Sequence, residues 1–185
     1  MKEFHGGKIP VSRKKGRDVD ISELTKAGGK WVLDGYLIGI FLSPFDVHTQ
    51  RAPVAGAVET VRHWQNENVL LAPMWWRIFL ERLRGRTADQ FSRYPHILEN
   101  ERTVMAIKGR DFPRHIVVVL IADKTVNQLT SLIKEGQAVE KGQRIAKIGF
   151  KGSQVDVIIP RIPGLKVLVK TGDRVKAGET VLASY

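Results

Sequence analysis

The amino-acid sequence predicts a β-rich α+β protein built from antiparallel strands with few helices. Short segments rich in valine, isoleucine and aromatic residues recur along the chain, and glycine or proline turns separate them. The last third also contains an internal repeat, in which each copy consists of two strands joined by glycine turns. We expect this C-terminal pair of repeated hairpins to resemble a barrel-sandwich hybrid.

Composition and charge limit the classes of function. A chain of 185 residues fits a single domain, residues 1–185. The sequence has no cysteine, which excludes a disulfide framework, a thiolate zinc site and a cysteine nucleophile. Its formal net charge of +11 favours anionic partners, but no nucleic-acid-binding motif accompanies that charge. We therefore expect neither nucleic acid nor a bound metal.

The predicted elements follow the apolar pattern along the chain. Residues 1–17 form a basic segment that we expect to be a loose arm, and a short helix over 21–26 follows it, capped by Asp20 or Ser22. A loop is expected over 45–50, between Pro44 and Pro53. Strands are predicted at 30–42, 54–64, 103–108, 115–121, 144–148, 155–159, 166–169 and 180–182.

Residues 69–86 differ from the rest because large apolar groups alternate there with arginines. From Trp75 onward the spacing predicts an amphipathic helix that ends at Gly85. Such a helix either covers the core or lies in a membrane surface, where tryptophans favour the interface and arginines meet anionic headgroups. Trp75, Trp76 and Arg77 are therefore candidates for contact with substrate or membrane.

The internal repeat allows a first functional interpretation. Four residues of the first copy recur 36 residues later: Lys134, Gly136, Val139 and Gly142 become Lys170, Gly172, Val175 and Gly178. Biotinyl and lipoyl carrier domains are built from such hairpins and modify a lysine in a tight turn between them. Lys151 lies near that turn, although no methionine flanks it. A carrier or binding module is thus one alternative.

Three sequence blocks point to another interpretation. The first is the Gly152-Ser153 pair, which lies between two predicted strands and between the two repeats. The second runs from Ser43-Pro-Phe-Asp46-Val-His48 to Pro53 and Gly56, and the third is Asn100-Glu-Arg102. Together, and in the order in which they follow one another along the chain, the blocks resemble the phosphatidylserine decarboxylase family of pyruvoyl-dependent proenzymes.

The resemblance implies a self-processing enzyme. In the family the serine hydroxyl attacks the preceding glycine carbonyl, and the ester eliminates to dehydroalanine, which hydrolyses to a pyruvoyl group. Here this would cut the chain into 1–152 and 153–185 and turn Ser153 into the cofactor. The expected reaction is decarboxylation of phosphatidylserine, or of a related serine-headed phospholipid, to phosphatidylethanolamine through a Schiff base with that pyruvoyl group.

The resemblance also implies roles for the Ser-Pro-x-Asp-x-His block. His48 is the candidate acid or base, and Asp46 either orients it or builds the turn. Longer family members have a second histidine where Arg51 stands, and Arg51 is a candidate for substrate or membrane contact. The expected partners are the phospholipid, an anionic membrane surface and the protein's own cleaved fragment. The expected location is peripheral, on the cytoplasmic side of the cell membrane.

Some departures from the family pattern allow a further alternative. The family's Pro-Ala-Asp-Gly block, expected upstream of Lys15, has no counterpart, and its aspartate belongs to the self-cleavage relay. Gln154 stands where threonine is usual, and Lys151 replaces an apolar residue. An inactive decarboxylase homologue is therefore a second alternative.

Overall fold

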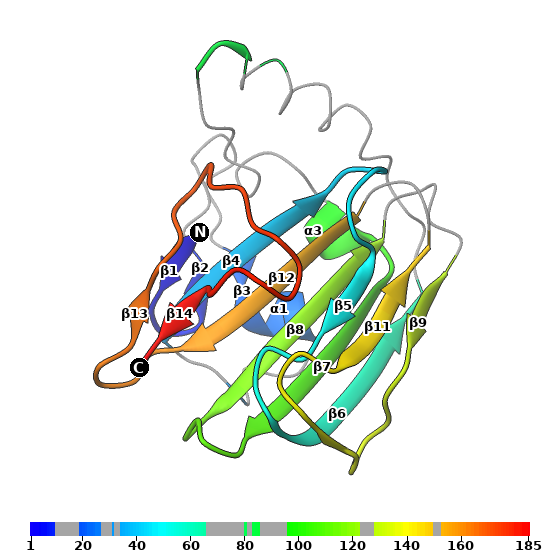
Figure 1. Cartoon of the computed structure of the whole chain (residues 1–185), viewed down its shortest axis with the longest axis vertical. Helices are drawn as coiled ribbons and strands as arrows, with labels where there is room; N and C mark the ends of the chain where they lie inside the picture. Colours follow the sequence, from blue (N-terminus) through cyan, green and yellow to red (C-terminus); the bar gives the residue numbers. More distant parts are fainter. Residues whose placement is uncertain are drawn as a thin grey trace.

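The computed structural model describes residues 1–9, 19–26, 31, 34–65, 80, 83–85, 96–122, 128–149 and 153–185. Its main element is a seven-stranded antiparallel sheet in the order β1-β4-β12-β8-β7-β6-β10 (Figure 1). These strands are β1 Lys2–Phe4, β4 Gly35–Leu42, β12 Ser153–Pro160, β8 His115–Ala122, β7 Arg102–Gly109, β6 Gly56–Trp64 and β10 Ala138–Val139. The β-rich α+β class predicted from the sequence is confirmed.

Smaller elements cover this sheet. A three-stranded sheet contains β5 Thr49–Arg51, β11 Arg144–Ile148 and β9 Leu129–Ser131. Two-stranded sheets are formed by β13 Lys166–Val167 with β14 Ala183–Ser184, and by β2 Lys8–Ile9 with β3 Val19–Asp20. The described helices are short: α1 Ile21–Thr25 and α3 His96–Glu99.

Strand β12 lies inside the large sheet, between β4 and β8. Its register places Ser153 opposite Leu42 of β4 and Ala122 of β8. All eight residues of β12 are buried. A strand that is covered on both faces needs apolar residues without alternation, which explains the run of valine and isoleucine in its sequence.

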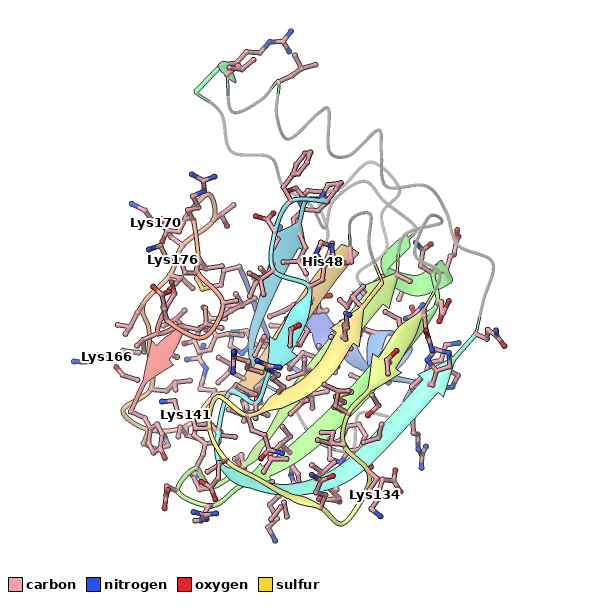
Figure 2. All side chains as sticks on the ribbon, turned by 45° about the vertical axis from the view of Figure 1, so that its right-hand side comes forward. His48, Lys134, Lys141, Lys166, Lys170 and Lys176 are labelled. Atoms are coloured by element: carbon pink, nitrogen blue, oxygen red, sulfur yellow. The ribbon has the colours of Figure 1, made fainter. Side chains whose placement is uncertain are left out.

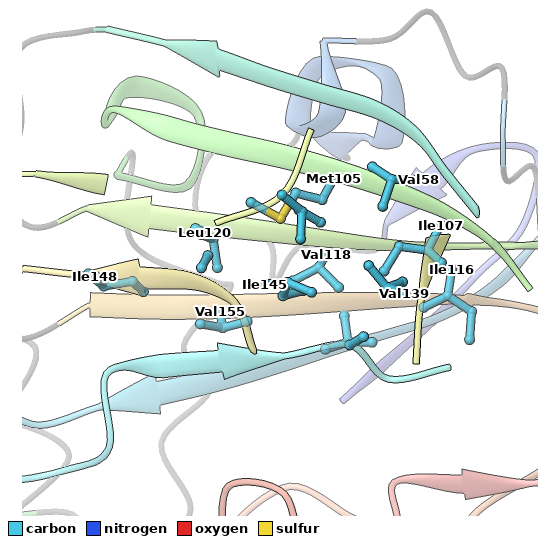
Figure 3. Packing of buried hydrophobic residues seen from close by; sticks show 14 of the residues in the cluster. Val58, Met105, Ile107, Ile116, Val118, Leu120, Val139, Ile145, Ile148 and Val155 are labelled. Carbon is cyan, nitrogen blue, oxygen red and sulfur yellow. The ribbon is translucent and has the colours of Figure 1, made fainter. Parts of the chain in front are cut away.

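The large sheet separates two apolar clusters. Met105 and Ile107 of β7 point to the side covered by the β5-β11-β9 sheet and belong to the same apolar cluster as Val155 and Ile148 (Figure 3). The alternate residues of β7, such as Val104, point to the opposite face and pack with Leu24 of α1 and Phe4. Successive side chains of a strand point to opposite faces, so β7 contributes to both clusters.

The N-terminal segment differs from the expected loose arm. Residues 2–4 form β1 on the edge of the large sheet, and Phe4 and Ile9 are only 1% exposed. These two apolar side chains anchor a segment whose composition is otherwise polar and basic. The expectation was therefore wrong for residues 2–9, whereas residues 10–18 lie outside the described part. Asp20 caps α1 through a 2.7 Å hydrogen bond from the Ser22 amide, as one of the two predicted alternatives.

The predicted repeat is present at the level of individual hydrogen bonds. The Gln137 amide donates to the Lys134 carbonyl, and the Asp173 amide donates to the Lys170 carbonyl, both at 3.2 Å. The glycines of both copies, including Gly142 and Gly178, have positive φ, which glycine adopts without strain. The strands at the two copies nevertheless belong to different sheets, and the described residues form no closed barrel.

Some expectations differ in detail or stay untested. Residues 49 and 50, expected within a loop, belong to the short strand β5, and the last strand is at 183–184 rather than at 180–182. Of the helix predicted from Trp75 to Gly85, only 80 and 83–85 are described, and the Arg84 amide donates to the Leu80 carbonyl at 3.1 Å. Within the described residues, no helix has the length and apolarity needed to cross a membrane.

Candidate active site

Ser153 is the first residue of the central strand and is completely buried. Its cross-strand neighbour is Ala122 of β8. The Ala122 amide donates to the Glu101 carbonyl at 2.9 Å, and the Ala122 carbonyl accepts from the Asn100 side chain at 2.6 Å. Both backbone groups of Ala122 therefore point away from β12. Ala122 and Ser153 form a non-hydrogen-bonded antiparallel pair, the type in which the two side chains lie closest. The Ser153 hydroxyl has no hydrogen-bond partner among the described residues. Gly152 lies outside them.

His48 follows a tight turn between β4 and β5. The Asp46 carboxylate accepts a 2.7 Å hydrogen bond from the Ser43 amide, and the Asp46 amide donates to the Ser43 carbonyl at 3.0 Å. The Asp46 side chain thus builds the turn. Its backbone carbonyl accepts a 2.7 Å hydrogen bond from Nδ1 of His48. Because a carbonyl oxygen can only accept, this bond places a proton on Nδ1 and leaves Nε2 as the nitrogen available for proton transfer.

A shallow pocket of about 400 Å³ lies beside His48. Its described lining residues are His48, Gln128, Thr130, Lys147, Ile148 and Gly149. The Ile148 amide donates to the His48 carbonyl at 2.9 Å, which joins the loop to β11. The pocket can receive a small polar group beside an imidazole and a lysine ammonium.

Ser153 and this pocket lie at the same end of the molecule. In Figure 2, His48 lies beside the end of β12 at which Ser153 begins the strand. The strand partners of Ser153, Leu42 and Ala122, belong to the same apolar cluster as Ile148 of the pocket wall. The fold therefore brings two distant sequence blocks together, with the serine buried in the layer below the histidine loop.

Arg51 has a different environment from that of His48. Its Nη1 donates to the Gly142 carbonyl at 2.7 Å. A Cβ atom added to Gly178 would lie 3.1 Å from Cδ of Arg51. Gly142 and Gly178 are equivalent positions of the two repeats, so Arg51 connects the two repeated turns. Arg51 is not among the described residues that line the pocket.

The opposite face of the large sheet carries a buried polar unit, which we define as Asn100, Arg102, Gln154 and Asp156. All four residues are 0% exposed. Nε2 of Gln154 donates to Oδ1 of Asp156 at 2.7 Å. Arg102 donates to the carbonyl of Leu24 at 3.2 Å and to that of Asn100 at 3.3 Å. The unit thus connects β12 and β7 with the end of α1.

Burial dominates the electrostatics of the polar unit. Desolvation raises the pKa of Asp156 to about 7, and the hydrogen bond from Gln154 and the charge of Arg102 only partly oppose this shift. Desolvation also lowers the pKa of the Arg102 guanidinium, against the attraction of Asp156. Near neutral pH the cluster therefore contains a carboxyl that is part protonated.

The sequence profile of the phosphatidylserine decarboxylase family matches residues 9–183, which is nearly the whole chain. The chain belongs to this family. The similarity explains why the Gly-Ser, Asp-x-His and Asn-Glu-Arg blocks occur in one chain. In the structure these three blocks gather around the start of β12.

Individual phosphatidylserine decarboxylase relatives agree with this assignment. A Methanothermobacter thermautotrophicus protein, named by inference an archaetidylserine decarboxylase proenzyme, is 36% identical over 97% of this chain and 67% of its own length. A similarly named protein of Methanocaldococcus jannaschii is 34% identical over 80% of this chain and 60% of its own. A phosphatidylserine decarboxylase proenzyme of Azorhizobium caulinodans is 34% identical over 80% and 53%.

The chain thus spans between about half and two thirds of the length of these decarboxylase relatives. No solved structure gives a significant match.

The sequence alone did not point to the polar unit. Asn100 and Arg102 were recognised as part of a family block, but no role was assigned to them. Asp156 was overlooked, although a carboxylate between valines of a predicted buried strand is a signal in itself. Trp75, Trp76 and Arg77 lie outside the described residues, and their proposed contacts stay predictions.

The raised pKa of Asp156 predicts a pH-dependent stability. Between about pH 4 and 7 the unfolded chain loses a proton that the folded chain keeps, because the folded pKa lies above the ordinary value of 3.8. The free energy of unfolding should therefore fall as the pH rises through this window, by at most about 1.4 kcal/mol per pH unit from this group. Above pH 7 this contribution should be constant.

Denaturant unfolding of Asp156→Asn across this pH range tests the prediction. The substitution should remove this part of the pH dependence, whereas Asp111→Asn, at an exposed carboxylate, should retain it. Equal slopes for wild type and Asp156→Asn would mean that Asp156 ionises normally in the folded protein.

Proposed function

We propose that this protein is a pyruvoyl-dependent decarboxylase of phosphatidylserine or a related serine-headed phospholipid, matured by self-cleavage between Gly152 and Ser153. One observation carries the proposal. The serine of the family's Gly-Ser pair is buried at the first position of the central strand, and its hydroxyl is unpartnered among the described residues. A hydroxyl without a competing partner is suited to attack the neighbouring carbonyl.

The surroundings of Ser153 fit a pyruvoyl group. Such a group supplies an electrophilic carbonyl that condenses with the substrate amine and accepts the electrons released with CO₂. The residue opposite Ser153 on strand β8 is the small Ala122. Apolar neighbours of the adjoining cluster would exclude water from the reactive carbonyl. The strand pairing with Leu42 would hold the new N-terminus in place.

His48 is the candidate for proton transfer. Its Nδ1 bond to the Asp46 carbonyl orients the ring, and it lines the pocket beside Lys147. Nε2, once it carries a proton, would deliver it to the carbon that loses CO₂. Lys147 would attract the phosphate of the headgroup into the pocket.

The two cleavage products should remain together as a heterodimer. Residues 153–160 pair with β4 along the full strand and with β8 along most of it. A cut before Ser153 would leave these contacts intact, because it falls at the end of the strand. The small fragment would thus contribute a central strand to the large one.

Self-cleavage is the first test. Wild type should separate on a denaturing gel into fragments of residues 1–152 and 153–185 and migrate as one species under native conditions. Ser153→Ala lacks the attacking hydroxyl and should remain one chain, whereas Ser184→Ala, at an exposed strand position, should be cut normally. An intact wild-type chain under all conditions would refute the proposal, and intact mass with a group on Lys151 would favour a carrier.

The second test concerns His48. His48→Gln should reduce decarboxylation by about 10² to 10⁴-fold, the usual contribution of a general acid or base, without loss of the fold. His5→Gln, at a histidine on the exposed N-terminal segment, is the matched control and should retain activity. The release of CO₂ from phosphatidylserine in mixed micelles is the measurement. Activity of His48→Gln within a few-fold of wild type would remove His48 from the mechanism.

We also propose that the protein binds peripherally to the cytoplasmic side of the cell membrane. The loop beside the pocket exposes two apolar side chains, Phe45 at 89% and Val47 at 58%. In Figure 2, Lys170 and Lys176 lie toward the same upper end of the molecule as His48. Apolar side chains beside cations suit the interface of a bilayer with anionic headgroups, which are abundant in the cytoplasmic leaflet.

Vesicle sedimentation tests the membrane proposal. Wild type should sediment with vesicles that contain phosphatidylserine more than with neutral vesicles, and salt should weaken the difference. Replacing Phe45 and Val47 together by serine should weaken binding by roughly tenfold or more, since burial of each side chain contributes about 1.5–3 kcal/mol. Val181→Ser, at a valine of similar exposure, should have no effect. Binding that is insensitive to the loop substitutions would contradict this placement.

A further inference from the structure

Ser153 is held on both sides by side chains that lie on the opposite face of the sheet. On one side, the side-chain amide of Asn100 donates a hydrogen bond to the carbonyl of Ala122, the cross-strand neighbour of Ser153. On the other side, the residue that follows the serine, Gln154, donates its side-chain amide to Asp156 at 2.7 Å. The polar unit therefore hydrogen-bonds to the cross-strand neighbour of Ser153 and includes the residue that follows the serine.

The polar unit is anchored by Arg102 within an otherwise apolar layer. This buried guanidinium donates to the carbonyl of Leu24, so that it joins the end of α1 to the start of β7. Two buried atoms of the unit, Nη2 of Arg102 and Oδ2 of Asp156, have no hydrogen-bond partner among the described residues. Burial of such groups costs free energy. A purely apolar layer would avoid that cost, which indicates a role beyond packing.

We propose that Asp156 is a positioning residue for Ser153, and that it acts through Gln154 to hold the start of β12 in the geometry needed for self-cleavage. This inference rests on the proposed self-cleavage of the chain. It assigns a role to the Asn-Glu-Arg block as well, because Asn100 and Arg102 complete the same unit.

The charges around Asp156 make this role sensitive to pH. The strand neighbours of Asp156, Gly39 of β4 and Val119 of β8, carry no charge. Among the described residues, the charges that act on it are Arg102 and the amino group of Met1. The neutral carboxyl accepts the Gln154 hydrogen bond without further solvation. A carboxylate at this buried position needs water or a closer cation, so its formation above about pH 7 should displace the start of β12.

The rate of self-cleavage tests the proposal directly. Asp156→Asn mimics the neutral carboxyl and cannot ionise, and Asp111→Asn is the control at an exposed carboxylate. Freshly translated chains of both variants should cleave at similar rates at about pH 6. At about pH 8, one unit above the pKa of Asp156, the control should be slower than Asp156→Asn by roughly tenfold, because only its neutral fraction is correctly positioned. An equal ratio of the two rates at both pH values would overturn the inference.

Hydrogen exchange gives a measurement that does not need cleavage. In the uncut Ser153→Ala chain, protection of the amides over 153–156 should decrease above about pH 7, and the added Asp156→Asn substitution should abolish that decrease. Equal protection in both chains would refute the role of Asp156 even if wild type cleaves. A protection difference in a protein whose wild type never cleaves would support the coupling to β12 and refute the proposed function instead.

Discussion

The pairing of β12 along both of its edges is the interaction on which the remaining structure depends. Strand β4 pairs with one edge of β12 and strand β8 with the other. This places Leu42 and Ala122 on either side of Ser153. Because the strand is buried on both faces, it needs a covering layer on each. The three-stranded sheet provides one layer, and α1 with β2 provides the other.

These two layers have different chemical tasks at the start of β12. The layer that contains β5 and β11 carries His48 and the pocket, where we propose that the headgroup binds. The opposite layer is closed and contains the polar unit around Asp156 and Arg102. A site with its reactive group between an accessible layer and a rigid buried layer can admit substrate while the backbone around the reactive residue stays in place.

The internal repeat contributes to this arrangement through its turns rather than through a common sheet. Gly142 and Gly178 occupy equivalent turn positions, and Arg51 contacts both turns from the end of β5. The strand that carries Arg51 follows directly after His48, so this clamp helps to fix the histidine loop. The repeat is thus a support for the active site, which agrees with the family assignment better than with a carrier domain built from two hairpins.

The sequence by itself determined the family, the strand-rich class and most of the strands, because these depend on local patterns and on motifs that the chain contains in order. The functions of single side chains needed the tertiary structure. Whether Asp46 orients His48 or builds the turn depended on hydrogen bonds at the loop, where its carboxylate bonds to Ser43 and its carbonyl to the histidine. The burial of Asp156 beside Arg102 was also decided only by tertiary structure, since residues 102 and 156 meet solely through the order of strands in the sheet, and no local pattern encodes that order.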